Sequence, residues 1–183
     1  MTKYISILRG INVAGNRKIL MADLKNLYLK LGFSNVITFI QSGNVIFDSG
    51  EGLPNDDTGQ KIEQAIRETF KFDVPVIVRT TAEWAVSIAS NPFWKEKDED
   101  INRLHLTFLK ELPVAEKLEK LKTIEFLPDK YQIIGQDVFI YCSGGYSDSK
   151  LTNQYFESKL GVSATTRNWK TVMKLHELTL SNV

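Results

Sequence analysis

The order of strand and helix patterns in the first 80 residues is the feature that most constrains the fold. Short apolar runs predict strands, and apolar residues at helical spacing predict two amphipathic helices between them. The predicted segments are strands at residues 4–9, 35–40, 44–48 and 74–79, a helix at residues 21–31, and a second helix that Asp57 or Thr58 caps and that Ile62, Ala65, Ile66 and Phe70 mark as amphipathic. Strand, helix, strand, strand, helix, strand is the order of the split βαβ, or ferredoxin-like, unit.

The second half of the chain repeats this order and then adds a helix. The predicted segments are strands at residues 103–109, 130–134, 138–142 and 162–166, helices at 114–121 and 148–160, and a final helix at 168–179. The sequence therefore predicts an α+β protein of two ferredoxin-like βαββαβ units with antiparallel sheets, plus a C-terminal helix. The predicted division is a first unit at 1–80, a helical and charged connector at 81–102, and a second unit with the C-terminal helix at 103–183.

Composition excludes several classes of function. The 23 basic and 22 acidic residues give a net charge of +1, so no global field would draw the chain to nucleic acid, and nucleic-acid binding is not the preferred expectation. The single cysteine, Cys142, cannot form an internal disulfide, and the start of the sequence does not resemble a signal peptide. No apolar run is long enough to span a membrane. We expect a cytoplasmic protein without a membrane partner.

Two short polar segments lie at strand ends: residues 9–12 follow the first strand, and residues 41–44 join the second strand to the third. Because the central strands are antiparallel neighbours, residues 9–12 and 41–44 are expected at the same end of the sheet. Their donor groups suit a phosphate or carboxylate. The predicted ligand-binding residues are Arg9, Asn12, Lys18, Gln41, Ser42 and Asn44, completed by Arg167 and Asn168. The alternative is that these residues only pin a hairpin and a loop to the sheet.

Arg167 and Asn168 belong to a third polar segment, residues 165–169, which precedes the last helix. Asn168 is a candidate N-cap, and a helix N-terminus flanked by Arg167 and Lys170 would attract an anion. The alternative assigns Asn168 to capping alone and Trp169 to the core.

Two other functions remain open at this stage. His105 and Thr107 have the His-x-Thr spacing of two-histidine phosphoesterases, although a second copy is missing. The topology is also that of the RNA-recognition motif, for which Tyr4 and Phe47 are the candidate stacking residues. A non-enzymatic module for RNA or protein is therefore a competing class. The two histidines form no metal cluster, no cofactor is indicated, and Ser42 has no general base beside it, so whether the protein is an enzyme is left open.

Read together, the three polar segments resemble one bacterial family, called domain of unknown function 1697. The matching blocks are Leu8-Arg9-Gly10-Ile11-Asn12-Val13, Ile40-Gln41-Ser42-Gly43-Asn44-Val45 and Thr166-Arg167-Asn168-Trp169, and the resemblance extends to Lys18, Met21 and Asn91-Pro92-Phe93.

The resemblance implies two ferredoxin-like units, no established activity and no cofactor. The positions that the family pattern marks as the functional surface are Arg9, Gly10, Asn12, Lys18, Gln41, Ser42, Gly43, Asn44, Arg167, Asn168 and Trp169. This chain has Ala14-Gly15 where the family commonly has Gly-Gly, and Phe39 where it often has Tyr. The second difference argues against a mechanism that needs a phenol at position 39.

Overall fold

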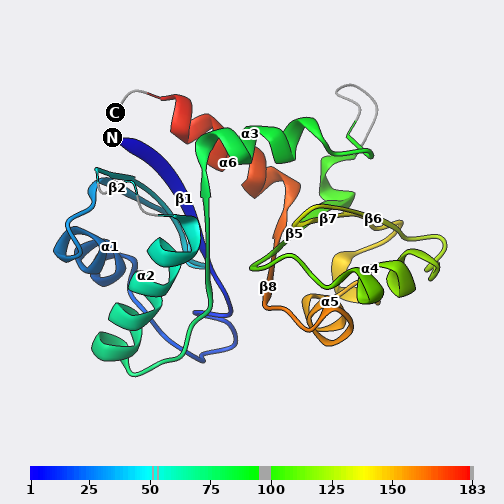
Figure 1. Cartoon of the computed structure of the whole chain (residues 1–183), viewed down its shortest axis with the longest axis horizontal. Helices are drawn as coiled ribbons and strands as arrows, with labels where there is room; N and C mark the ends of the chain where they lie inside the picture. Colours follow the sequence, from blue (N-terminus) through cyan, green and yellow to red (C-terminus); the bar gives the residue numbers. More distant parts are fainter. Residues whose placement is uncertain (51, 53, 95–99, 182–183) are drawn as a thin grey trace. The chain divides into compact units, whose positions relative to one another are not determined.

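The computed structural model describes residues 1–50, 52, 54–94 and 100–181 (Figure 1). In chain order the elements are β1 (Thr2–Leu8), α1 (Met21–Lys30), β2 (Ser34–Phe39), β3 (Asn44–Ser49), α2 (Asn55–Phe70), β4 (Val76–Thr80), α3 (Thr81–Ala89), η1 (Ile101–Arg103), β5 (Leu104–Leu109), α4 (Ala115–Lys122), β6 (Lys130–Ile134), β7 (Asp137–Tyr141), η2 (Tyr146–Asp148), α5 (Asn153–Leu160), β8 (Ala164–Asn168) and α6 (Trp169–Leu180). The two elements labelled η are short 3₁₀ helices.

Strands β1 to β4 form one antiparallel sheet in the order β2-β3-β1-β4. Alternate residues of β1 point to opposite faces, and Tyr4 and Leu8 join the core that α1 and α2 cover (Figure 1). On the same face the Ser6 hydroxyl lies 2.7 Å from the Tyr28 hydroxyl. Burial raises the pKa of Tyr28, so this hydroxyl keeps its proton and remains a hydrogen-bond donor inside the core.

Strands β5 to β8 form a second antiparallel sheet with the equivalent order, β6-β7-β5-β8. The backbone hydrogen bonds at the ends of the first strands are also equivalent. Leu8 donates to the Gly43 carbonyl at 2.8 Å, and Leu109 donates to the Gln136 carbonyl at 2.8 Å. The predicted class of two ferredoxin-like units is therefore confirmed, and the repeat extends to the register of the strands.

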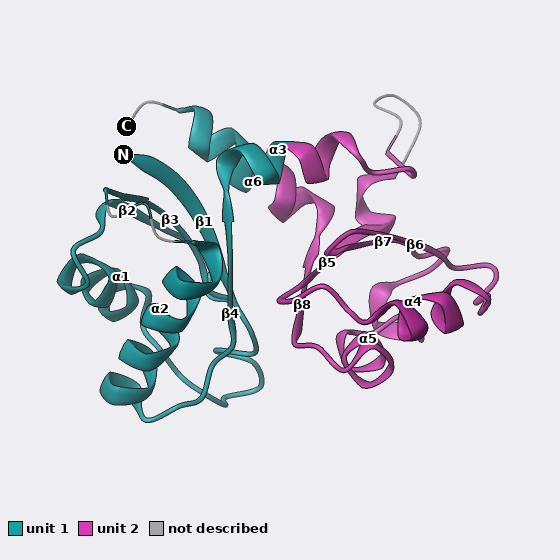
Figure 2. Cartoon of the chain, in the orientation of Figure 1, with its two compact units in different colours: residues 1–85, 175–183 teal, residues 86–174 magenta. Residues whose placement is uncertain are grey.

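The compact units are Met1–Ala85 with Leu175–Val183, and Val86–Lys174 (Figure 2). Helices α3 and α6 each contribute residues to both units, whereas the sequence places α3 in a connector and all of α6 in the second unit. The last turn of α6 is tied to the first unit, since Lys3 Nζ donates to the Thr179 carbonyl at 3.2 Å.

Helix starts follow capping chemistry where the sequence supplies it. Glu83 Oε2 accepts from the Thr80 backbone N–H at 2.7 Å, and Thr80 Oγ1 accepts from the Glu83 N–H at 3.2 Å, which forms a capping box at the start of α3. The predicted start of the helix at residue 148 is wrong. Thr152 caps α5 through the Tyr155 N–H at 3.2 Å, so that helix begins five residues later. None of the helices in the described ranges combines the length and apolar character needed to cross a membrane.

Candidate functional site

The segment after β1, residues 9–19, is a small hairpin that we call the 9–19 loop. Its tip is a tight turn in which Ala14 and Gly15 have φ of 49° and 80°, and the Asn16 N–H donates to the Val13 carbonyl at 3.0 Å. A second rung joins the Asn12 N–H to the Arg17 carbonyl at 3.3 Å. Backbone bonds therefore give this polar segment a defined conformation.

The side chain of Asn12 fixes the 9–19 loop to the turn between β2 and β3. Its Nδ2 donates to the Ile19 carbonyl at 2.9 Å and to the Gln41 carbonyl at 2.8 Å, while its Oδ1 accepts from the Ile19 N–H at 2.9 Å. The predicted meeting of the first strand's end with the neighbouring turn is thus present in the structure. Both amide hydrogens of Asn12 are already used, so Asn12 acts as a clamp and has no donor left for a ligand.

Gly43 and Asn44 hold the other side of this junction. A Cβ atom on Gly43 would lie 2.7 Å from Ile11 Cδ1 and 2.9 Å from Leu8 Cβ, and Gly43 has a φ of 78°. Asn44 is fully buried, and its Nδ2 donates to the Phe39 carbonyl at 2.9 Å and to Ser42 Oγ at 3.2 Å. These two predicted site residues are therefore part of the fold itself, as the structural alternative expected.

Five polar side chains remain around the clamp, and we call them the basic loop surface: Arg9, Arg17, Lys18, Gln41 and Ser42. Lys18 and Gln41 are exposed, and the other three are half-buried. Arg17 Nη1 lies 3.4 Å from the Arg9 carbonyl, which brings its guanidinium back over the start of the loop. Sequence reasoning missed Arg17, although its position beside Lys18 just after a Gly-Asn turn was the available signal.

Three exposed apolar side chains come from the same segments. Val13, Leu20 and Ile40 are 58%, 57% and 48% exposed. Ile40 also has a φ of 50°, which is unfavourable for a β-branched residue. Apolar side chains are therefore exposed on the same stretches of chain as the basic loop surface.

Arg167 and Asn168 belong to the second unit, where each has a structural role. Arg167 is buried, its Nη1 donates to the Thr166 carbonyl at 3.0 Å, and burial lowers its pKa to about 10. Asn168 Oδ1 accepts from the Thr171 N–H at 2.8 Å, so the predicted N-cap of α6 is present. The Trp169 ring is fully buried and lies 6.1 Å from the Trp94 ring.

The residues predicted for the phosphoesterase and RNA-recognition alternatives are buried, so they do not form an open site. His105 is 7% exposed beneath the Tyr146 ring, which stacks on it at 4.4 Å, and Thr107 is fully buried against Thr166. Burial lowers the pKa of His105. Tyr4 and Phe47 stack on each other at 5.5 Å within the core, so they cannot stack on bases.

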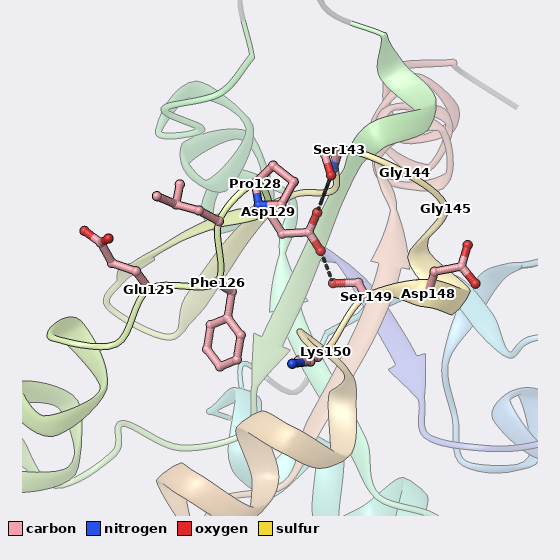
Figure 3. Close-up of a pocket in the computed structure, with 11 residues that line it drawn as sticks. Glu125, Phe126, Pro128, Asp129, Ser143, Gly144, Gly145, Asp148, Ser149 and Lys150 are labelled. Carbon is pink, nitrogen blue, oxygen red and sulfur yellow. Dashed lines mark hydrogen bonds between the residues drawn. The ribbon is translucent and has the colours of Figure 1, made fainter.

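A pocket that the sequence did not predict lies in the second unit (Figure 3). Its volume is about 470 Å³, and it lies between residues 125–129 and residues 143–150. Asp129 organises its wall, because Oδ1 accepts from the Ser143 N–H at 2.8 Å and the Ser143 hydroxyl at 2.9 Å, and Oδ2 accepts from the Ser149 hydroxyl at 2.7 Å. Serine, glycine and aspartate are common in loops, so residue type alone gave no signal.

The Asp129 hydrogen bonds predict a specific response of stability to acid. Burial raises the pKa of this carboxyl, but the bonds from Ser149 and Ser143 together outweigh it and hold the pKa below its ordinary value. Because the pKa of Asp129 is lower in the folded state than in the unfolded state, its ionised form stabilises the fold. This contribution is complete above the unfolded-state pKa, about 3.9, and is lost as the pH falls through the folded-state pKa. The urea midpoint of the wild type should therefore exceed that of Asp129→Asn at pH 7, and the two midpoints should lie closer together at pH 3. A constant difference between the two proteins would contradict this account.

Among the described residues, no three His, Cys, Asp or Glu side chains are placed to hold a metal ion. Cys142 is buried, burial raises the pKa of its thiol, and it is therefore not an activated nucleophile.

Fold and junction together define a class: an α+β protein of two ferredoxin-like units in which a clamped polar loop follows the first strand. Residues 1–139 match the family model described as "Protein of unknown function (DUF1697)". The chain belongs to this family, which confirms the resemblance; the matched residues include the first two polar blocks, and the third, at residues 166–169, lies beyond them.

Solved structures extend the likeness to the whole chain. The fold is similar to that of the conserved bacterial protein SP0830 from Streptococcus pneumoniae, with a TM-score of 0.76 and 23% sequence identity over 97% of this chain and 98% of that chain. At this identity the similarity shows the fold alone. The comparison with curated proteins gave no significant match.

Proposed function

We propose that the protein binds a small phosphate- or carboxylate-bearing ligand on the basic loop surface of its first unit. The observation that carries this proposal is the gathering of three cationic side chains, Arg9, Arg17 and Lys18, on a loop that Asn12 fixes to the neighbouring turn. Residues 9–20 and 39–44 contain no acidic residue. The lone buried Cys142 is consistent with action in a reducing compartment, the cytoplasm.

The polar segments divide into residues that the fold uses and residues that it leaves available. Asn12, Gly43 and Asn44 are occupied by the junction, as described above. Lys18 and Gln41 are exposed, and their side chains make no hydrogen bond or ion pair within the described ranges. Folding therefore explains the first group of residues but not the second.

Backbone strain in the 9–19 loop supports a functional role. Ala14 and Arg17 have φ of 49° and 46°, a conformation that costs a non-glycine residue roughly 1–2 kcal/mol. Strain of this kind persists only where the surrounding structure enforces it, and it is commonest at binding sites. Arg17 Nη1 lies 3.4 Å from the Arg9 carbonyl, so the Arg17 guanidinium is held over the start of the 9–19 loop.

The chemistry of the surface fits an oxyanion. A guanidinium group can donate two parallel hydrogen bonds to a phosphate or carboxylate, and a lysine adds a mobile positive charge. Ser42 is the one hydroxyl on the surface, and its Oγ accepts from Asn44 Nδ2. We therefore propose binding and assign no reaction.

The test uses inorganic phosphate and citrate as probes, added at constant ionic strength while the thermal midpoint is recorded. Both should raise the midpoint of the wild type, and Lys18→Ala should weaken the apparent affinity about tenfold, which corresponds to one charge-assisted hydrogen bond. Arg9→Ala should have at least the same effect. Lys25→Ala is the matched control, because Lys25 is an exposed lysine of α1 outside this surface.

Two outcomes would count against the proposal. The anions could fail to stabilise the wild type, or Lys25→Ala could reduce stabilisation as much as Lys18→Ala does. Unfolding of Arg9→Ala without any ligand would identify Arg9 as a structural residue, and Lys18→Ala would then decide the question alone.

A further inference from the structure

We propose that the outer edge of β6, in the second unit, binds an extended peptide segment of a partner protein by strand addition. The edge strand of a sheet carries backbone N–H and C=O groups that a further strand can pair with. Among the described residues β6 pairs with β7 alone, so its other side is such an edge. This inference is independent of the anion site in the first unit.

Hydrogen bonds on β7 show which backbone groups of β6 point outward. The Gln136 carbonyl accepts from Leu109 at 2.8 Å and the Cys142 N–H donates to Arg103 at 2.9 Å, so the even-numbered residues of β7 bond to β5. Its odd-numbered residues therefore bond to β6, where the register pairs them with residues 130, 132 and 134. The backbone groups of Tyr131 and Ile133 consequently face the free edge.

A groove runs along this edge. Its volume is about 540 Å³, and we call it the edge groove. Its lining residues are Phe93, Lys122, Ile124, Glu125, Phe126, Leu127, Asp129, Lys130, Tyr131, Gln132 and Ile133.

The lining residues come from both faces of the sheet. Tyr131 and Ile133 pack with the core beneath α4 and α5. Lys130 and Gln132 point to the opposite face, where the Phe93 ring lies 6.5 Å from the Tyr141 ring. A single groove that touches side chains of both faces must pass beside the strand's edge, next to the free backbone groups.

The walls of the edge groove describe the partner. Phe126 is half-buried and Leu127 and Ile124 are 70% and 38% exposed, which favours apolar side chains in the bound segment. Lys122 is already paired with Glu119 at 2.7 Å, whereas the side chain of Lys130 has no hydrogen bond or ion pair within the described ranges. The bound segment is therefore expected to carry apolar side chains at alternate positions and an acidic side chain near Lys130.

A second copy of this chain fits the edge groove less well than a separate peptide. In a symmetric pair of β6 strands, Tyr131 would face the partner's Ile133, but both side chains already pack in their own core. The groove would then stay unfilled, and contact between two five-residue strands falls well short of the roughly 1,000 Å² expected of a stable interface. The occupant must bring side chains of its own.

The test is selection of a phage-displayed library of random hexapeptides on the whole protein, followed by synthesis of the enriched sequences. Enriched peptides should alternate apolar residues and carry an acidic residue. The Tyr131 and Ile133 amides are expected to exchange quickly in the free protein, and binding should slow this exchange. N-methylation of the peptide's pairing amides should weaken binding at least about fivefold, the worth of one backbone hydrogen bond.

Two variants test whether a bound peptide pairs with the β6 backbone and contacts Lys130, or binds in another way. Ile133→Pro removes an outward N–H that β7 does not use, a position where an edge strand tolerates proline. It should abolish binding while amide spectra show an intact fold. If Ile133→Pro does not fold, Lys130→Glu carries the test, because it should replace the acidic preference of the selected peptides with a basic one. Failure to enrich any sequence, or enriched peptides that tolerate N-methylation and leave both amides unprotected, would overturn the proposal.

Discussion

Gly43→Ala is expected to destabilise the first unit by about 3–4 kcal/mol. Part of this cost is conformational, because a φ of 78° places any L-residue with a Cβ in the left-handed region, at roughly 1–2 kcal/mol. The rest is steric. The new Cβ would lie 2.7 Å from Ile11 Cδ1 and 2.9 Å from Leu8 Cβ, and overpacking of this kind typically costs about 1–3 kcal/mol.

Gly15→Ala is the matched control for this experiment. Gly15 has a φ of 80°, but a Cβ there would meet nothing within 4 Å, so only the conformational cost applies. Urea unfolding should therefore give a loss of about 1–2 kcal/mol for Gly15→Ala and a clearly larger loss for Gly43→Ala. Equal losses in the two variants would show that the junction between β1 and the turn adapts to the added methyl group. In that case the close packing around Gly43 would not be what fixes the 9–19 loop.

The order of elements was predictable because it depends on local signals. Apolar periodicity acts over a few residues, as do Gly32 after α1 and the Thr80–Glu83 capping box of α3, and the elements appear in the predicted order. The start of α5 is set by the local Thr152 cap, which the prediction missed, whereas the division between units depends on contacts between segments that are distant in sequence. Periodicity carries no information on those contacts.

The candidate site was predictable in location but only partly in role. Topology alone brings the end of β1 to the turn before β3, so residues 9–12 and 41–44 had to meet. Whether a carboxamide there faces solvent or satisfies the main chain is decided by partners such as the Ile19 and Gln41 carbonyls. Every residue has a carbonyl, so the sequence cannot distinguish a clamp from a ligand-binding asparagine.

This distinction changes how the family blocks are interpreted. Gly43 and Asn44 in one block and Asn12 in the other form a single packing and hydrogen-bonding junction. Their joint occurrence is explained by folding even without a ligand. The functional hypothesis then depends on the side chains that the junction presents, above all Lys18 and Gln41, and variants of the junction itself report on folding.

Asn12→Ala tests the junction from the other side, with an expected loss of about 3–4 kcal/mol. The substitution removes three hydrogen bonds, to the Ile19 carbonyl, the Gln41 carbonyl and the Ile19 N–H, each worth about 1 kcal/mol. It also places alanine at a φ of 55°, which asparagine tolerates better.

Two further substitutions at position 12 separate these contributions. Asn12→Gly loses the same three bonds but accepts the positive φ, so it should be about 1 kcal/mol less destabilising than Asn12→Ala. Asn12→Asp keeps the acceptor for the Ile19 N–H but turns a carboxylate oxygen toward two carbonyls, so it should lose stability as the carboxyl ionises above about pH 4. Urea midpoints at pH 7 and pH 4 measure both effects. If Asn12→Ala and the wild type unfold at the same urea concentration, the clamp contributes nothing to the fold, and the Asn12 carboxamide would again be a candidate for ligand binding.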